Sequence, residues 1–173
     1  MSALASLSTL CFEDACLRLD AESRALADAL ARSIPDLAGA SWHHEKLRVH
    51  VEPAQDDGRR ARSAIGPRHK ADARLCPKDA ESAWTLFQTF AAAHGLRAVR
   101  HHEAEDSRRT YYFQGIGIDT GDEVRCLIYL PGSPESPHLS IGVFVGPRFR
   151  REALAEDESP LAPRTVGKLI GVG

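Results

Sequence analysis

The stretch that decides the fold is TYYFQGIGIDTGDEVRCLIYLPGSPESPHLSIGVFVGP, residues Thr110 to Pro147. Val, Ile, Tyr and Phe, which favour strands, recur in three runs along it. Two clusters of turn residues separate these runs, Asp-Thr-Gly-Asp at 119–122 and Pro-Gly-Ser-Pro-Glu-Ser-Pro at 131–137. The pattern predicts three antiparallel strands connected by short turns.

Two helices are expected before these strands. From Glu13 to Ser33, apolar residues recur at helical spacing on one face and charged residues cover most of the remainder, until Pro35 ends the pattern. A second apolar stripe runs from Lys78 to Ala93. Pro77 suits its first helical position and Gly95 suits its C-terminal cap, so both ends of this helix are marked.

Three further strands are marked less strongly. Leu47, Val49 and Val51 alternate with polar residues, which is the period of a half-buried strand. A weaker pattern predicts its antiparallel partner at about His69 to Leu75, and another strand begins at Leu96. Strands joined by short turns pair antiparallel, so the sequence predicts an α+β two-layer sandwich. Its antiparallel sheet would have about 5–6 strands, with two helices packed on one face.

The length of 173 residues suits one domain with a sizeable core. Hydrophobic residues make up 43% of the chain and charged residues 27%, which is typical of a folded protein and argues against global disorder. Residues 1–147 are expected to form this single α+β domain. Residues 148–173 are charged and interrupted by Pro, and they are expected to be a loosely held extension.

The net charge of −2 creates no overall field that attracts nucleic acid or an anionic membrane, so neither is favoured as a partner. No run approaches the ~20 apolar residues of a transmembrane helix. The run from Met1 to Phe12 also lacks the features of a signal peptide, and Leu10 stands where a lipoprotein cleavage site requires a small residue. The chain as written is therefore expected in the cytoplasm. The cell envelope is the alternative if its start omits an export signal.

The spacing of the four cysteines matches no metal motif. In a reducing compartment they are expected to act as small, mostly buried hydrophobic residues. A disulfide between Cys76 and Cys126 is the alternative for an exported protein.

Histidines form adjacent pairs at 43–44 and 101–102. Neighbouring side chains of a strand point to opposite faces, so neither pair can hold one metal ion. A site would require histidines of separate strands to meet an acid across the sheet, which no spacing implies. No metal or cofactor is therefore expected. The weak candidates for such a site are His44, His50, His102 and Asp106.

Asp119-Thr-Gly121 is similar to the Asp-Thr-Gly loop of retroviral-type aspartic proteases, in which two such aspartates share a proton. Asp122 stands where those enzymes have a small residue, and two helices precede the motif although that family is almost entirely β. A hairpin turn between Ile118 and Val124 is the simpler interpretation. A hydrolase that uses Asp119 or a His–carboxylate cluster stays an alternative.

A basic segment spans residues 59–74, and Asp72 is its single acid. No aromatic residues are interleaved with it to stack on bases, so a solvated loop is expected. A weak contact with nucleic acid is the alternative. The basic residues of the segment are Arg59, Arg60, Arg62, Arg68, Lys70 and Arg74, with His69 if it is protonated.

The chain resembles small LppA-like envelope lipoproteins of actinobacteria from about Asp20 to Pro147. The matching pieces are AESRALADALARSIPDLAGASW, DAESAWTLFQTFAAAHGLRAV and the strand run that ends in His-Leu-Ser-Ile-Gly-Val-Phe-Val-Gly-Pro. The resemblance implies an exported, non-catalytic α+β domain and supplies no functional residues. The chain lacks the lipobox, and Gly146-Pro147 stands where a Gly-Cys pair would support a disulfide.

The leading hypothesis is a non-enzymatic α+β module that binds a protein partner, because no set of acid, base, nucleophile or metal ligands converges in the sequence. The function is expected on the sheet face that the two helices leave uncovered. A flat apolar patch on that face would support a partner surface.

Overall fold

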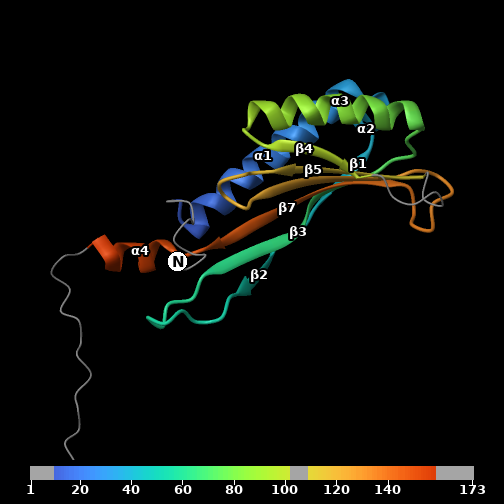
Figure 1. The fold of residues 1–173 in the computed structure, drawn as a ribbon. Coiled ribbons are helices and arrows are strands. Elements are labelled where there is room, and N and C mark those ends of the chain that lie inside the picture. Colours follow the sequence, from blue (N-terminus) through green and yellow to red (C-terminus); the bar gives the residue numbers. More distant parts are fainter. Residues whose placement is uncertain (1–9, 102–108, 159–173) are drawn as a thin grey trace, which may run out of the picture.

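The computed structural model describes residues 10–101 and 109–158. In these residues seven strands form one antiparallel sheet, and the two long helices lie on the same face of it (Figure 1). The predicted α+β class with an antiparallel sheet and helices is confirmed. The sheet has one strand more than the upper bound expected from the sequence, because the segment around His44 forms a strand of its own.

The helices are α1 (Phe12–Ser33), α2 (Pro35–Ala38), α3 (Pro77–Ala93) and α4 (Arg151–Glu158). The strands are β1 (Ser41–His44), β2 (Arg48–Val51), β3 (Arg62–Asp72), β4 (Arg97–His101), β5 (Thr110–Ile116), β6 (Glu123–Tyr129) and β7 (His138–Arg148). The sheet order is β1-β3-β7-β6-β5-β4, and β2 pairs with β3 next to β1. None of the described helices is long and apolar enough to cross a membrane.

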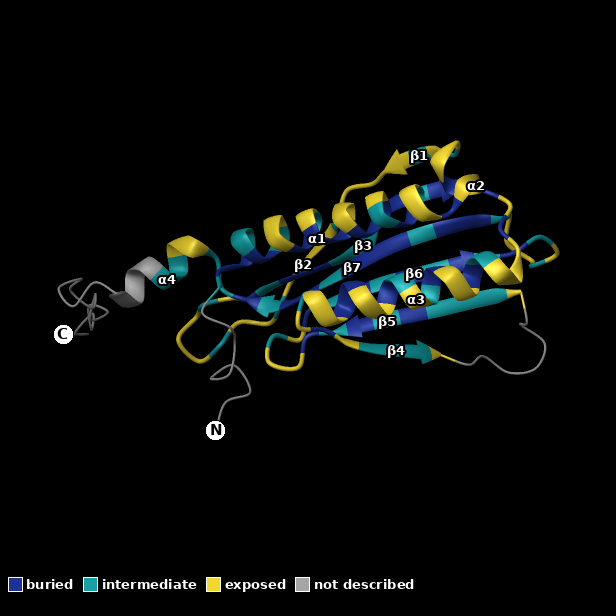
Figure 2. Ribbon diagram, turned by 90° about the horizontal axis from the view of Figure 1, so that it is seen from above, coloured by how far each residue is buried: buried dark blue, intermediate teal, exposed yellow. Residues whose placement is uncertain are grey.

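The core lies between the sheet and the helix layer, in which α1 packs on β7 and β3 while α3 packs on β4 and β5 (Figure 2). Every second residue of a strand points to the same face of the sheet, and such residues form the floor of this core. In β7 these residues are Leu139, Ile141 and Val143, which are at most 1% exposed. The rings of Phe87 on α3 and Phe113 on β5 meet with centroids 5.8 Å apart. Burial of this apolar layer is the main source of stability.

The basic segment at residues 59–74 was predicted to be a loop, but most of it forms β3. It is an 11-residue strand, and it pairs with β7 along nearly its whole length. A shift of register between Pro67 and His69 lets the strand pass a proline, which has no N–H to donate to the ladder. The expected antiparallel pairing with the Leu47–Val51 segment is confirmed for β2, but β2 lies opposite residues 62–65 rather than 69–75.

The expected boundary after residue 147 falls inside the fold, because β7 continues to Arg148 and α4 follows. Glu13 of α1 accepts hydrogen bonds from Arg150 Nε at 2.9 Å and from the Arg151 backbone N–H at 3.0 Å. Burial alone would raise the pKa of Glu13, but the hydrogen bonds from Arg151, Arg150 and Cys11 lower it to about 2. The first residues of the predicted extension are thus attached to α1, and residues 159–173 lie outside the described part.

Candidate functional site

The open face is the sheet face opposite α1 and α3. Because side chains alternate, the pairing register assigns residues of every strand to it. Aromatic, aliphatic and basic side chains mix on this face. Its central members are Ile65, Pro67 and Lys70 of β3, His138, Ser140, Gly142 and Phe144 of β7, Arg125, Leu127 and Tyr129 of β6, and Tyr112 and Gln114 of β5.

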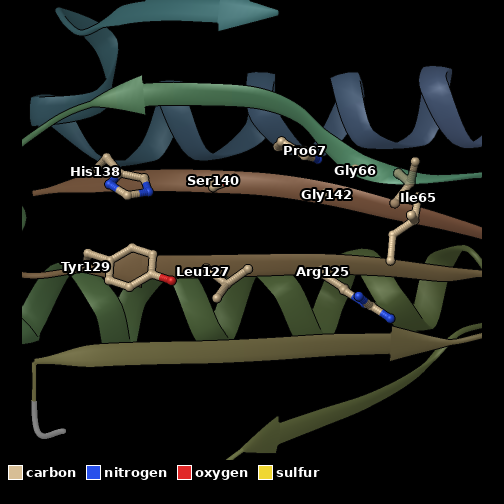
Figure 3. A pocket seen from close by; sticks show the side chains of 10 residues that line it. Ile65, Gly66, Pro67, Arg125, Leu127, Tyr129, His138, Ser140 and Gly142 are labelled. Atoms are coloured by element: carbon tan, nitrogen blue, oxygen red, sulfur yellow. The ribbon is translucent and has the colours of Figure 1, made fainter. Parts of the chain in front are cut away.

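A hollow of about 300 Å³ lies on the open face over β3, β7 and β6 (Figure 3). Its floor lacks large side chains, since Gly142 has none, Ser140 has a short one and Gly66 contributes only backbone. The backbones approach closely here, because a Cβ on Gly142 would lie 3.2 Å from the carbonyl oxygen of Gly66. The φ of Gly66 is +154°, a conformation that favours glycine. Gly142 therefore both permits this close pairing and leaves the space above it open, whereas a Cβ on Gly66 would point toward the backbone of residues 46–48.

One end of the hollow is polar. The rings of Tyr129 and His138 are nearly parallel there, with centroids 4.6 Å apart on neighbouring strands. His138 is 8% exposed, and its Nδ1 lies 2.7 Å from the carbonyl oxygen of Ser136. A carbonyl can only accept, so Nδ1–H donates and a neutral His138 keeps Nε2 as an acceptor. Figure 3 shows one ring nitrogen of His138 directed toward Ser140 and the Tyr129 hydroxyl directed toward Leu127.

Arg125 closes the opposite end of the hollow. Its Nε donates to Glu123 at 2.8 Å and its Nη2 lies 2.6 Å from the same carboxylate oxygen. The guanidinium also lies over the Phe144 ring, 5.9 Å from the centroid. Glu123 thus neutralises Arg125 and keeps its charge at the rim.

Among the described residues of the open face, three cations have no acidic partner. Of the described acids on this face, Glu123 binds Arg125, and Asp72 lies 2.9 Å from His43 Nε2, a contact that is an ion pair only when His43 is protonated. By contrast, Arg48, Lys70 and Arg97 form no ion pair with any residue in the described ranges. Two of these cations flank the hollow directly, because Arg48 lies opposite Ile65 and Lys70 lies opposite Ser140 in the strand register.

The histidine candidates do not converge as a metal site would require. His44 meets His69 instead, with the two Nδ1 atoms 2.7 Å apart, while His50 lies opposite Ser63 on β2. His102 and Asp106 lie outside the described residues. Among the residues that are described, no group of three or more His, Cys, Asp or Glu could hold a metal ion.

The His44–His69 contact belongs to a hydrogen-bond chain that anchors α1 to the sheet. Ser23 Oγ–H donates to the Asp20 carbonyl at 2.9 Å, so Ser23 accepts from His69 Nε2–H at 3.1 Å. His69 Nδ1 must then accept from His44. Burial, with a smaller effect of the nearby His44 charge, lowers the pKa of His69 to about 4. Because Ser23 is fully buried, this chain is structural rather than a nucleophile and its base.

Asp119 and Asp122 have opposite environments. Asp119 is exposed in the β5–β6 turn, in which Gly121 adopts a φ of +68° and Gly117 N–H donates to the Asp122 carbonyl. Asp122 is 4% exposed and binds both terminal nitrogens of Arg148, at 2.5 and 2.8 Å. The geometry of the segment is that of a hairpin turn, and its buried carboxylate is held by an arginine rather than by a second aspartate.

A small cleft of about 160 Å³ near this turn contains a His–carboxylate pair that the sequence did not indicate. Glu22 accepts from Arg18 Nε at 2.9 Å, and the same oxygen lies 3.4 Å from His94 Nδ1. Asp119 and Thr120 line the same cleft. These residues come from α1, from the end of α3 and from the turn, so only the folded chain brings them together.

The basic candidates are separated by the alternation of β3 and do not form one patch. Arg68 bonds Asp20 and the Glu45 carbonyl, while Lys70 lies on the open face. Arg59 bonds Asp57 and lies over the Phe149 ring, 4.5 Å from its centroid. Arg62 pairs with the end of β7, and Arg60 and Arg74 are exposed outside the strand.

The four cysteines are all free. The Cys76–Cys126 alternative is therefore not realised, because Cys126 is buried in β6 while Cys76 is exposed at the start of α3. Burial raises the pKa of Cys126 to about 12. It is also the main reason why the pKa of Cys16 is raised to about 11. Neither thiol is activated as a nucleophile.

No known protein family matches this chain, and neither a curated protein nor a solved structure is similar to it at a significant level. The resemblance to LppA-like lipoproteins stays a prediction.

Proposed function

We propose that the chain is a non-enzymatic module that binds an acidic segment of a protein partner on the open face. The observation that supports this most is the hollow of about 300 Å³ on the sheet face that no described helix covers. Two cations flank it, Arg48 and Lys70, and neither forms an ion pair with another described residue. Apolar hollows rimmed by polar residues mark interaction sites on proteins. Arg48 and Lys70 favour a partner of negative charge, because opposite potentials steer association and set its register.

The test is photo-crosslinking of the full chain in its native cells. A benzoylphenylalanine replaces Tyr112 on the open face or, as the control, the exposed Gln88 on α3. We expect one defined protein adduct at 112 and none at 88. Equal adducts at both positions, or an adduct with nucleic acid alone, would overturn the proposal.

The captured partner then permits a charge test with purified proteins. Lys70→Glu should weaken its binding at least about tenfold, since the charge beside the hollow is reversed. The matched control Lys78→Glu makes the same change on the exposed start of α3 and should alter the dissociation constant less than about twofold. A partner that binds both variants equally does not use this face.

A hydrolase is the second candidate, and the cleft that holds Glu22, His94 and Asp119 favours it. A histidine beside a carboxylate can act as a general base. Hydrolysis of small ester substrates should then be lost in His94→Asn and retained in His43→Asn, whose histidine is exposed on β1. Equal activity in both variants, or none in the wild type, would remove this candidate.

A further inference from the structure

The hollow is divided into an apolar part and a polar end, which restricts what it can bind. Ile65, Pro67 and Leu127 line the apolar part, and Tyr129, His138 and Ser140 line the polar end. Its volume of about 300 Å³ is at the lower limit of small-ligand sites. It suits one apolar side chain of a peptide better than a nucleotide or a large cofactor.

The polar end has hydrogen-bonding capacity left over. His138 uses Nδ1–H for the Ser136 carbonyl, and no described residue bonds its Nε2, which accepts a hydrogen bond in a neutral imidazole. The hydroxyl of Ser140 and the ammonium of Lys70, its neighbour in the register, are donors. An acidic peptide can satisfy both kinds of group. Its backbone N–H can donate to His138 Nε2, and its carboxylate can accept hydrogen bonds from Ser140 and Lys70.

We propose that the hollow recognises an apolar residue followed by an acidic residue in an extended segment of the partner. This rests on the proposed function of the open face and adds the chemistry that the face selects. The apolar side chain lies over Leu127 and Pro67, and the acidic side chain lies between Ser140 and Lys70. Arg125 contributes little to anion binding, because Glu123 already neutralises it.

A peptide fits these observations better than a single-stranded nucleic acid. Nucleic-acid platforms stack successive bases on several aromatic rings and track the backbone with a groove of cations. The wall of the hollow is aliphatic on β3, and the guanidinium at its end is paired. An oligonucleotide therefore serves as the competing probe.

The experiment is an NMR titration of the full ¹⁵N-labelled chain with acetyl-Gly-Phe-Glu-Gly-amide. Two comparison peptides carry Ala in place of Phe or Lys in place of Glu. We expect saturable shifts of the Leu127, Ser140 and Gly142 amides, with affinity at least about tenfold lower for each comparison peptide. A ten-nucleotide oligothymidine is titrated in parallel and should leave these amides unshifted.

Two variants test whether the shifts report the hollow itself. Ser140→Leu fills the polar end and should reduce peptide affinity at least about tenfold, while Arg97→Glu changes a charge of the same face away from the hollow and should reduce it less than about threefold. Unchanged affinity of Ser140→Leu overturns the inference. If the peptide fails while crosslinking at residue 112 persists, the inference fails and the proposed function stands. If the oligonucleotide alone shifts these amides, both fail.

Discussion

On the helix-covered face of β7, Leu139, Ile141 and Val143 are at most 1% exposed, whereas the same strand presents His138, Ser140 and Gly142 to the opposite face. The backbone pairing is common to both faces, so the side chains alone distinguish them. The covered face is mainly apolar and is packed against α1 and α3, with His69 as a buried polar exception that bonds Ser23. The open face mixes rings, small residues and charges around a hollow. The difference indicates that stability resides mainly on the covered face, and it supports the proposal that the open face binds a partner.

The largest expected contrast is between two adjacent residues of β5. Phe113 is fully buried against Phe87 and Trp84, while Tyr112 lies on the open face beside His101. Phe113→Ala should lower the free energy of unfolding by about 3–5 kcal/mol through lost burial and a cavity. Tyr112→Ala should lower it by about 1 kcal/mol. Urea denaturation measures both, and similar losses would contradict the division between the faces.

The buried ion pair gives the next contrast. Asp122→Asn leaves the guanidinium of Arg148, which is 1% exposed, without its counter-charge. The free energy of unfolding should fall by about 3 kcal/mol or more, because an unpaired buried charge is costly. Asp119→Asn, three residues earlier in the exposed turn, is the matched control and should have no measurable effect on stability. If the two variants unfold alike, the roles assigned to the two aspartates are wrong.

The hydrogen-bond chain under α1 predicts how stability depends on pH. The pKa of His69 is about 4 in the folded protein against an ordinary value of 6.5, so the unfolded chain takes up the proton first as the pH falls. Its contribution is present above pH 6.5 and is lost progressively toward pH 4, by about 2–3 kcal/mol. The groups that face His69 are Ser23, His44, Asp20, Arg24 and Arg68.

Urea denaturation between pH 7 and pH 4 measures this loss. His69→Gln should flatten the profile across that range, and His50→Gln, which changes an exposed histidine of β2, should retain the wild-type slope. A wild-type profile without a fall between pH 6.5 and pH 4 would show that His69 is not kept neutral by the fold.

The smallest expected effect on stability lies on the open face. Lys70→Glu removes no ion pair within the described ranges and should change the free energy of unfolding by less than about 0.5 kcal/mol. The substitution should weaken only the binding of the partner. Thermal unfolding checks the first part, and a large shift in the unfolding midpoint would mean that Lys70 has a structural role.

The sequence predicted correctly those helices and strands that are marked by their own residues. Helical periodicity was sufficient to predict α1 and α3, and the turn residues were sufficient to predict the β5–β6–β7 meander. β3 was missed over most of its length, because its basic residues resemble a loop and its stability comes from pairing with the distant β7. The boundary at residue 147 was placed too early for the same reason, since the Asp122–Arg148 pair joins residues 26 positions apart.

For the candidate site, the sequence predicted only which face of the sheet is open, not the hollow on it. The covering of one side by two helices leaves the other side open, which the element order implies. The hollow itself depends on the register that brings Pro67 opposite Gly142, and on the absence of a side chain at Gly142. No sequence spacing encodes that register. The His44–His69 contact escaped prediction likewise, because it joins β1 to a strand that was placed elsewhere.

The central claim is that the open face binds a partner and contributes little to stability. The most direct test is Leu127→Glu, which places a negative charge in the hollow. The account predicts a free energy of unfolding within about 1 kcal/mol of wild type. It also predicts loss of binding to the partner that crosslinks at residue 112. Binding as tight as that of the wild type, with the fold intact, would contradict it.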